Sequence, residues 1–281
     1  MPPPSPIVLL KATNYIGSGI WYDESSNSNN AIKDTGIIAK NSKGNGIILN
    51  GTTSWILPDI NLANSWTVSV WYKNKGAQNG TGACIITQIT NPGINMAIGD
   101  IINNGENDGY FQGGFNRSGS GWASGTSFRL VYDEWTNIQV TWDETNLVTY
   151  INGVLLGTEQ PGFLPEDSNR EYRIGRRWDG DSYMVGEIGE VSIYNQALTE
   201  IQVIDSYNLS SPTFNDNAEN CKPEIVSDRI NKNVLEQKIN TTIYGFVQKH
   251  NEDNITNPYK YSSYAEYMQN KFGTIQRLPR C

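Results

Sequence analysis

The residues with the clearest capacity for chemistry lie in the run Arg176-Arg-Trp-Asp-Gly-Asp-Ser-Tyr183. Sugar recognition uses an aromatic platform under the ring and a few polar groups on the hydroxyls, and this run supplies both. We therefore predict a glycan-binding site made of Trp122, Trp178, Asp179, Asp181 and Tyr183. In a competing interpretation, Trp122 and Trp178 are structural and cap the ends of the hydrophobic core.

Several other kinds of chemistry are excluded by composition. The chain has a single histidine, His250, so a catalytic or zinc site built on several imidazoles cannot form. It contains no G-x-S-x-G elbow, phosphate-binding loop or C-x-x-C pair. Its formal net charge of -8 argues against a nucleic acid partner, which needs clustered Lys and Arg. No apolar run approaches the roughly 18 residues of a membrane span, so none is expected.

A second group of chemically distinctive residues lies near the C-terminus. Aromatic and Met side chains recur there in a polar background, and such side chains anchor protein interfaces. We predict an assembly interface from the following residues: Tyr259, Tyr261, Tyr264, Tyr267, Met268 and Phe272. Cys221 and Cys281 bracket the same segment, and whether they are bridged stays open; Cys84 is read as a buried thiol in a strand.

The elements that position these groups are predicted to be short β-strands. In Trp66–Tyr72, Trp66, Val68 and Val70 fall on one face, the period of two that marks a half-buried strand. Asn152-Gly153 between two apolar runs predicts a hairpin with a type I′ turn. Further strands are expected over the following ranges: 46–50, 82–89, 109–115, 127–132, 135–142, 171–175 and 187–194. This spacing favours an all-β sandwich.

The strand pattern ends near residue 198. Thr199-Glu-Ile-Gln202 matches a capping box and predicts a short helix to about Tyr207, followed by a polar linker over 210–217. Helical spacing then returns. The chain is therefore divided into an extended N-terminal arm (1–6), a β-sandwich (7–211) and a mostly helical C-terminal docking segment (212–281).

Four parts of the chain, in order, carry a family pattern. They are Trp21-Tyr-Asp-Glu-Ser-Ser-Asn-Ser-Asn-Asn30, Trp66-Thr-Val-Ser-Val-Trp71, Trp135–Asp143 with Tyr150-Ile-Asn-Gly-Val154, and Arg173–Gly175 with Gly186-Glu-Ile-Gly-Glu-Val-Ser-Ile-Tyr-Asn195 and Ala197–Thr199. Residues 7–208 thus resemble the laminin-G-like branch of the concanavalin A-like superfamily. The resemblance implies a two-sheet antiparallel jelly-roll sandwich. Gly189 stands where the family usually has Asp, so any role of that carboxylate is absent.

The resemblance also bears on metals and catalysis. Many relatives hold calcium at one rim, which implies Asp179 and Asp181 as ligands, or else a loop with the acidic residues Asp100, Glu106 and Asp108. No cofactor is required. Glucan-hydrolysing relatives carry a carboxylate pair in an E-x-D-x-x-E motif, which this chain lacks. Glu187 and Glu190 are expected to face opposite ways on a regular strand, as solvated residues.

We therefore expect a non-enzymatic structural or binding protein: a lectin-like sandwich built into a larger assembly. The C-terminal segment resembles the tails of structural proteins from large DNA viruses, which implies a capsid or virion-surface component with other subunits as partners. The alternative is a free or displayed glycan-binding adhesion module. The N-terminus shows no secretory signal pattern, which favours a virion or cytoplasmic assembly, with surface display as the alternative.

Overall fold

The structure is a computed structural model, and it describes residues 2–60, 62, 64–76, 83–88, 97–102, 110–117, 121–165, 170–177 and 180–214. The chain divides into two compact units, Met1–Asn215 and Asp216–Cys281. The second unit lies outside the described residues, and so do Cys221, Cys281 and the six predicted interface residues.

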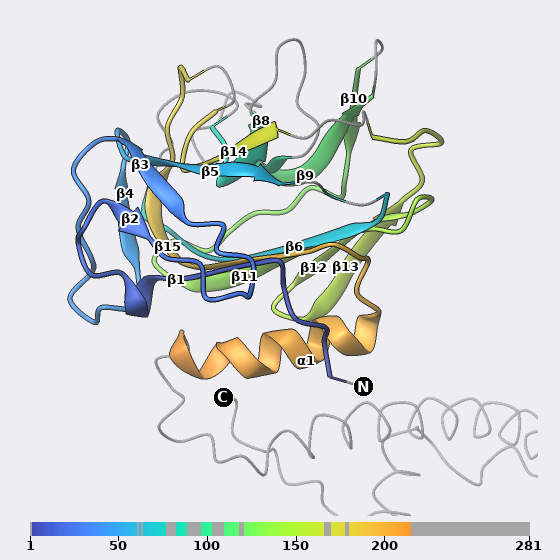
Figure 1. Cartoon of the computed structure of the whole chain (residues 1–281). Coiled ribbons are helices and arrows are strands. Elements are labelled where there is room, and N and C mark those ends of the chain that lie inside the picture. The colour runs from blue at the N-terminus through green and yellow to red at the C-terminus, as the bar shows by residue number, and fades with distance from the viewer. Residues whose placement is uncertain are drawn as a thin grey trace, which may run out of the picture. The chain divides into compact units, whose positions relative to one another are not determined.

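The first unit consists of two antiparallel sheets packed face to face (Figure 1), as predicted. The seven-stranded sheet contains β1 (Val8–Lys11), β4 (Ile47–Asn50), β6 (Trp66–Asn74), β11 (Trp135–Trp142), β12 (Leu147–Ile151), β13 (Val154–Glu159) and β15 (Val185–Tyr194). The eight-stranded sheet contains β2 (Ile20–Trp21), β3 (Ala31–Thr35), β5 (Ser54–Ile60), β7 (Ile86–Gln88), β8 (Ala97–Ile102), β9 (Tyr110–Arg117), β10 (Gly121–Ser124) and β14 (Arg170–Ile174).

Strand order in the seven-stranded sheet is β1-β15-β6-β11-β12-β13, with β4 also paired to β15. The order in the other sheet is β10-β9-β8-β7-β14-β5-β3-β2. Hydrogen-bonded neighbours are thus often far apart in sequence, as in a jelly roll. In the part of the chain that is described, no helix is both long enough and apolar enough to cross a membrane.

The predicted hairpin is confirmed. Asn152 and Gly153 connect β12 to β13 with φ values of 52° and 74°, the left-handed pair that a type I′ turn requires. One predicted strand is wrong: residues 127–132 form only isolated bridges, through Phe128 and Tyr132. The strands β1, β2, β3, β5, β8 and β10 were not predicted, because most are short and the longer ones are interrupted by polar, Pro or Gly residues.

The core lies between the sheets. Cross-strand pairs of β6 and β11 line it, such as Val68 opposite Val140, and both side chains are fully buried. Cys84 is buried, as predicted, but it precedes β7 and does not lie in a strand. Opposite Val140, Gly113 of β9 has no Cβ, and a Cβ there would lie 3.2 Å from Val140 Cγ1. The two sheets therefore approach each other closely at this point.

Substituting Val140→Ala should lower the free energy of unfolding by about 1–3 kcal/mol, since it removes buried methyl groups and leaves a cavity against Gly113. Urea denaturation followed by Trp fluorescence measures this. A change below about 0.5 kcal/mol would contradict the close packing described, because that is the usual size of an exposed-site effect.

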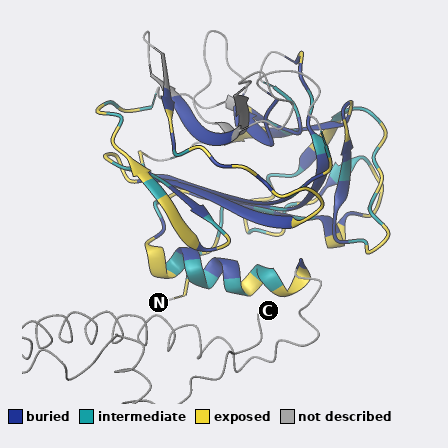
Figure 2. Ribbon diagram, turned by 180° about the vertical axis from the view of Figure 1, so that it is seen from behind, coloured by how far each residue is buried: buried dark blue, intermediate teal, exposed yellow. Residues whose placement is uncertain are grey.

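Helix α1 (Glu200–Ser210) covers the outer face of the seven-stranded sheet (Figures 1 and 2). Its predicted capping box is present, with the Thr199 side chain and Gln202 satisfying each other's backbone amides. The Tyr207 ring stacks on Trp71 of β6 with centroids 5.6 Å apart, and Trp71 Nε1 donates to Ser210 Oγ at 2.8 Å. The outward residues of β6 are therefore buried as well as its inward ones.

The first unit continues beyond the predicted boundary at residue 211. A 3-10 helix η2 (Ser211–Thr213) follows α1 and places Phe214 against Trp71, with ring centroids 4.6 Å apart. Phe214 is buried, and Asn45 Nδ2 donates to the Thr213 carbonyl at 2.9 Å. The first residues of the expected polar linker are thus packed on the sandwich. They are held there because the Phe214 ring is buried against Trp71.

Candidate functional site

The predicted sugar-binding run forms a loop shaped like a short ribbon at the end of β14. Arg176 and Tyr183 form an isolated antiparallel bridge, and Arg177 N donates to Ser182 O at 2.8 Å. Gly180, with φ of 90°, turns the chain back, a conformation that costs glycine little. The local sequence therefore folds into a tight loop that brings the side chains of its two ends together.

Arg176 fixes this loop from inside. Its Nε and Nη2 donate to the Gly180 carbonyl at 2.8 and 2.5 Å, and its Nη1 lies 3.0 Å from Asp34 Oδ2 on β3. The guanidinium also lies over the Tyr183 ring, 4.7 Å from its centroid. Asp34 in turn accepts from Ser54 Oγ at 2.9 Å. The loop is thus held on the eight-stranded sheet with Tyr183 in a defined orientation.

Only part of the predicted site lies among the described residues. Tyr183 is half-buried and Asp181 is exposed. Trp178 and Asp179 lie outside the described residues; Trp122 lies on β10, but its side chain is outside them too. The structure therefore brings Tyr183 together with Arg176 and leaves the other members of the site as predictions. Asp34 was missed, because it lies 142 residues from Arg176 and no local pattern marks it.

Most of the candidate calcium ligands also lie outside the described residues. Of its candidate ligands, Asp179, Glu106 and Asp108 are not among the described residues, and only the backbone of Asp100 is described. Within the described ranges, no group of three or more His, Cys, Asp or Glu side chains could hold a metal ion. Calcium at Asp179 and Asp181 stays a prediction.

The prediction for Glu187 and Glu190 is wrong on both counts. A β-bulge at Gly189 shifts the register of β15, so Glu187 lies opposite Lys73 and Glu190 opposite Trp71. Lys73 and Trp71 are two apart on β6, which places both glutamates on the same, outer face. Glu187 is buried, at 7% exposed, and Glu190 is half-buried, which raises the pKa of its carboxyl.

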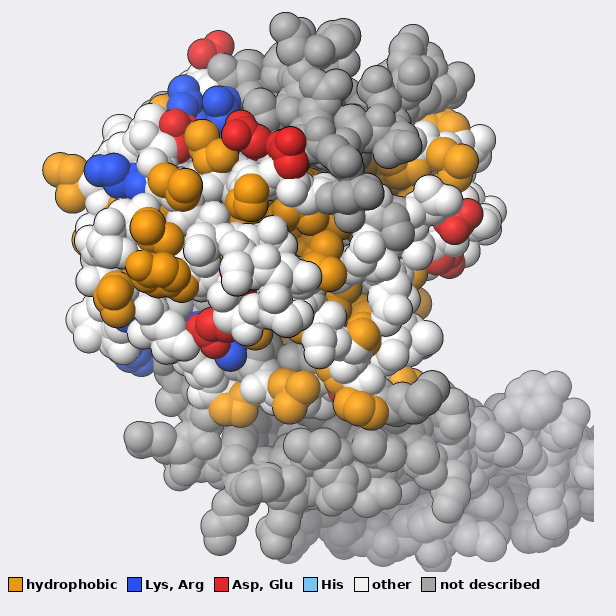
Figure 3. All heavy atoms as spheres, in the orientation of Figure 1, with side chains coloured by type: hydrophobic (Ala, Val, Ile, Leu, Met, Phe, Trp, Pro, Cys, Tyr) orange, Lys and Arg blue, Asp and Glu red, His pale blue; other side chains and the backbone are white. Residues whose placement is uncertain are grey.

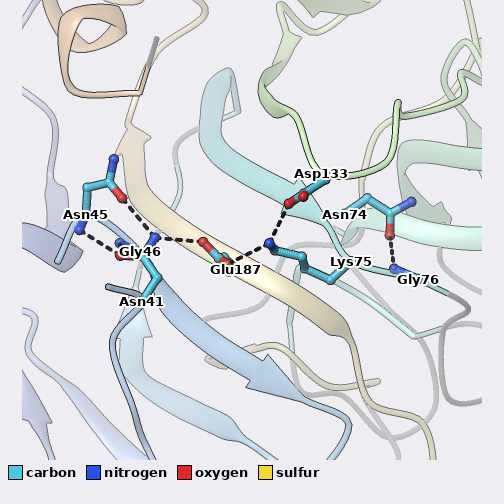
Figure 4. Close-up of polar contacts among 8 residues, drawn as sticks. All are labelled: Asn41, Asn45, Gly46, Asn74, Lys75, Gly76, Asp133 and Glu187. Carbon is cyan, nitrogen blue, oxygen red and sulfur yellow. Dashed lines mark hydrogen bonds and ion pairs between the residues drawn. The ribbon is translucent and has the colours of Figure 1, made fainter. Parts of the chain in front are cut away.

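Glu187 belongs to a polar network that joins four segments (Figure 4). Asn41 Nδ2 donates to Glu187 Oε2 at 2.7 Å and to Asn45 Oδ1 at 2.9 Å. On the other side, Lys75 Nζ lies 3.2 Å from Glu187 Oε1 and also pairs with Asp133. This hydrogen bond from Lys75 lowers the pKa of the Asp133 carboxyl. Both oxygens of Glu187 are thus engaged by protein groups.

The sequence matches the family model described as the concanavalin A-like lectin/glucanases superfamily over residues 49–204, more than half of the chain. The chain belongs to this superfamily. No curated protein matches it.

Several solved structures have a similar fold. One is domain 4 of AbnA, an extracellular arabinanase from Geobacillus stearothermophilus, in complex with arabinotriose. It shares 24% sequence identity and a TM-score of 0.58 with this chain, and the alignment covers 72% of this chain and 97% of that domain. Another is the binding domain of botulinum neurotoxin DC in complex with rat synaptotagmin II: 18% identity, TM-score 0.57, over 73% of this chain. A third is a structure of botulinum neurotoxin type C, whose cell entry depends on interaction with two ganglioside molecules; it has 19% identity and a TM-score of 0.55 over 73% of this chain. This chain spans about half (51%) of each neurotoxin chain.

In this concanavalin A-like chain, the polar residues that follow Trp21 have a structural role. Asp23 Oδ1 accepts from Leu9 N at 2.8 Å, while Ser25 Oγ and Asn29 Nδ2 donate to the Ile7 carbonyl at 3.0 and 2.9 Å. The polar run thereby ties down the N-terminal strand β1. These hydrogen bonds fasten the N-terminal strand to the sandwich.

Helix α1 and Phe214 cover the outer face of the seven-stranded sheet. The eight-stranded sheet carries Asp34 and adjoins the loop that holds Tyr183.

Proposed function

We propose that this chain is a non-catalytic, carbohydrate-binding protein whose sugar site is the loop from Arg176 to Tyr183. The observation that carries the proposal is the orientation of Tyr183, which the guanidinium of Arg176 covers from one side at 4.7 Å. A half-buried aromatic ring held in this way costs little entropy when a sugar stacks on it. Exposed Asp181 supplies a carboxylate for sugar hydroxyls, and the proposed site also includes Trp122, Trp178 and Asp179.

The structural neighbours support a binding role. The arabinanase domain was solved with arabinotriose, and its alignment with this chain covers almost all of that domain. The neurotoxin domains are described with a protein receptor and with gangliosides, but this chain matches only about half of each. The neighbour whose own chain is covered almost completely is thus the one with a bound saccharide, and this supports a saccharide as the ligand class.

The proposal that the protein is not an enzyme is supported by the state of its two neighbouring acids. A retaining glycosidase needs an ionised nucleophile and a protonated acid about 5–5.5 Å apart and open to the substrate. Glu187 is instead engaged by Lys75 and Asn41. It also lies with Glu190 on the face of the sheet that α1 covers. These contacts give the pair a structural role.

Binding is tested by titration of the full chain with arabinotriose and on an immobilised glycan array. Replacing Tyr183→Ala should weaken binding to the responding glycan by about tenfold or more, because the stacking surface is lost. The matched control is Tyr132→Ala, which removes a tyrosine that is 47% exposed in another loop and should leave the affinity unchanged.

Three results would contradict the proposal. They are the absence of binding to every glycan on the array, unchanged affinity in the Tyr183→Ala protein, and the release of reducing sugar during incubation. The last would show an enzyme, and loss of that turnover in Glu187→Gln protein would identify the acid.

A second role, as a subunit of a larger assembly such as a virus particle, is favoured by β13. This strand lies at the end of its sheet, and its residues Val154, Leu155 and Leu156 are all exposed. Exposed apolar residues on an edge strand mark a surface for contact with another chain. We propose that the docking segment, which now begins at residue 216 and carries the Tyr, Met and Phe anchors, joins the sandwich to other subunits, so that the lectin-like module is displayed on a particle.

A further inference from the structure

Two loops meet at one end of the β2–β3 ribbon. In this ribbon Ile20 lies opposite Ile32, and Lys33 N donates to Gly19 O at 2.9 Å. The loop that enters β2 (residues 15–19) and the loop that leaves β3 (residues 36–40) therefore emerge at the same rim. Each carries one isoleucine that points into solvent: Ile16 is 75% exposed and Ile37 is 81% exposed.

Both loops are held by hydrogen bonds. Lys40 Nζ donates to the carbonyls of Thr13 and Tyr15 at 3.0 and 3.4 Å, which ties one loop to the other. Thr53 Oγ1 donates to the Ile37 carbonyl at 3.1 Å. Gly36 has a φ of 77°, and a Cβ there would lie 2.6 Å from the Thr52 carbonyl oxygen. The exposed isoleucines are thus presented by an ordered backbone.

The charge around these isoleucines differs from that of the whole chain. Residues 15–19 and 36–44 contain Lys40 and Lys43 and no acidic residue, although the chain has a net charge of -8. On β3 between the loops, Lys33 is exposed, while Asp34 is paired with Arg176. Hydrophobic side chains reach the surface beside Lys and Arg on the side of the molecule where β2, β3 and β4 lie (Figure 3).

A single exposed isoleucine is ordinary on a protein surface. Here Ile16 and Ile37 occupy adjacent loops, and Ile32, 60% exposed, lies on the strand between them. Aliphatic groups at loop tips with lysines around them are the pattern of a peripheral membrane contact, in which the apolar groups enter the headgroup region and the cations meet anionic lipids.

We propose that this rim, residues 15–19 and 36–40 with Ile32 and Lys33, binds the surface of a bilayer that contains anionic phospholipid. Ile16 and Ile37 enter the boundary between headgroups and acyl chains, and exposed Lys33 contacts the phosphates, while Lys40 adds positive charge behind it. The residues of the rim differ from those of the proposed sugar site. Vesicle binding can therefore be tested independently of glycan binding. Together, the two would place the module on a cell surface, in contact with both lipid and glycan.

The test is co-sedimentation of the full chain with vesicles of phosphatidylcholine alone or mixed with phosphatidylserine. We expect binding to the mixed vesicles, weaker binding to the neutral ones and a decrease as salt is raised. The double variant Ile16→Ser/Ile37→Ser should bind the mixed vesicles about tenfold or more weakly. Its melting temperature should be unchanged, because both side chains are exposed in the folded state.

The matched control is Ile201→Ser/Leu209→Ser, which removes two aliphatic residues of α1 that are 63% and 74% exposed. It should bind vesicles as the unaltered chain does. The proposal is overturned if the unaltered chain does not sediment with the mixed vesicles at low salt, or if both double variants lose binding equally. It is also overturned if the rim variant abolishes a concentration-dependent dimer on size-exclusion chromatography, which would assign the rim to a second copy.

Discussion

A chain ending at Ser211 should melt roughly 8–15 °C below a chain ending at Asn215, because it lacks the Phe214 ring; this corresponds to about 3–5 kcal/mol. Phe214 packs between Trp71 and Trp135, with ring centroids 4.6 and 4.9 Å away. The shorter chain also leaves the buried amide of Asn45 without its acceptor, the Thr213 carbonyl.

The comparison between these two chains is made by thermal unfolding, with Phe214→Ala in the chain ending at Asn215 as the control. That variant keeps the Thr213 carbonyl and should account for most of the loss. Equal melting temperatures for the 211 and 215 chains would contradict the packing of Phe214. In the assembly proposal, the chain ending at Asn215 stays folded but fails to join its particle, whereas aggregation or unfolding of this chain would show that residues 216–281 are part of the folding unit.

The strands with a clear period of two could be predicted from the sequence. Val68 and Val140 were assigned to the core because their neighbours alternate, and both are fully buried. The same pattern predicted solvent on the other face of β6, where Thr67, Ser69 and Trp71 are instead buried. A local period reveals which residues share a face, but it cannot reveal that a helix more than 130 residues later will cover the second face.

The candidate site was harder to predict, because it depends on contacts between residues that are far apart in the sequence. The loop from Arg176 to Tyr183 was found from its composition. Its partner Asp34 was not, because the ion pair forms only when β3 and the end of β14 come together. Similarly, Asn41 and Glu187 are hydrogen-bonded across 146 residues. Sequence reasoning about single segments identifies candidate groups but not the long-range partners that decide their protonation and orientation.

The bulge at Gly189 shows how one residue can reverse a local prediction. On a regular strand, Glu187 and Glu190 would face opposite sides. The extra residue inserted at Gly189 returns Glu190 to the same face as Glu187. The glycine was noted in the sequence as the residue that replaces a family aspartate, and its structural partner is now identified: Phe214 occupies the space that a side chain at 189 would need.

Restoring the family residue with Gly189→Asp should therefore destabilise the protein by about 4 kcal/mol or more. A Cβ at this position would overlap the ring of Phe214 and lie 3.1 Å from the Asn45 carbonyl oxygen. The new carboxylate would also be near the acidic side chains of Glu187 and Glu190 on the same strand, which adds repulsion between like charges. Because this variant could fail to fold, Gly189→Ala is measured beside it, and it should show the steric part of the loss, about 1–3 kcal/mol.

A double-mutant cycle separates this mechanism from general damage to β15. Phe214→Ala alone removes a packed ring, but in a Gly189→Ala background the ring is already displaced. The second substitution should therefore cost much less there, with a coupling energy of about 1–3 kcal/mol from urea denaturation of the four proteins. Additive losses within about 0.5 kcal/mol would show that Phe214 and residue 189 do not compete for space. Strong coupling would instead mean that the absence of a side chain at Gly189 and the packing of the Phe214 ring depend on each other, because both use the same space on the outer face of β15.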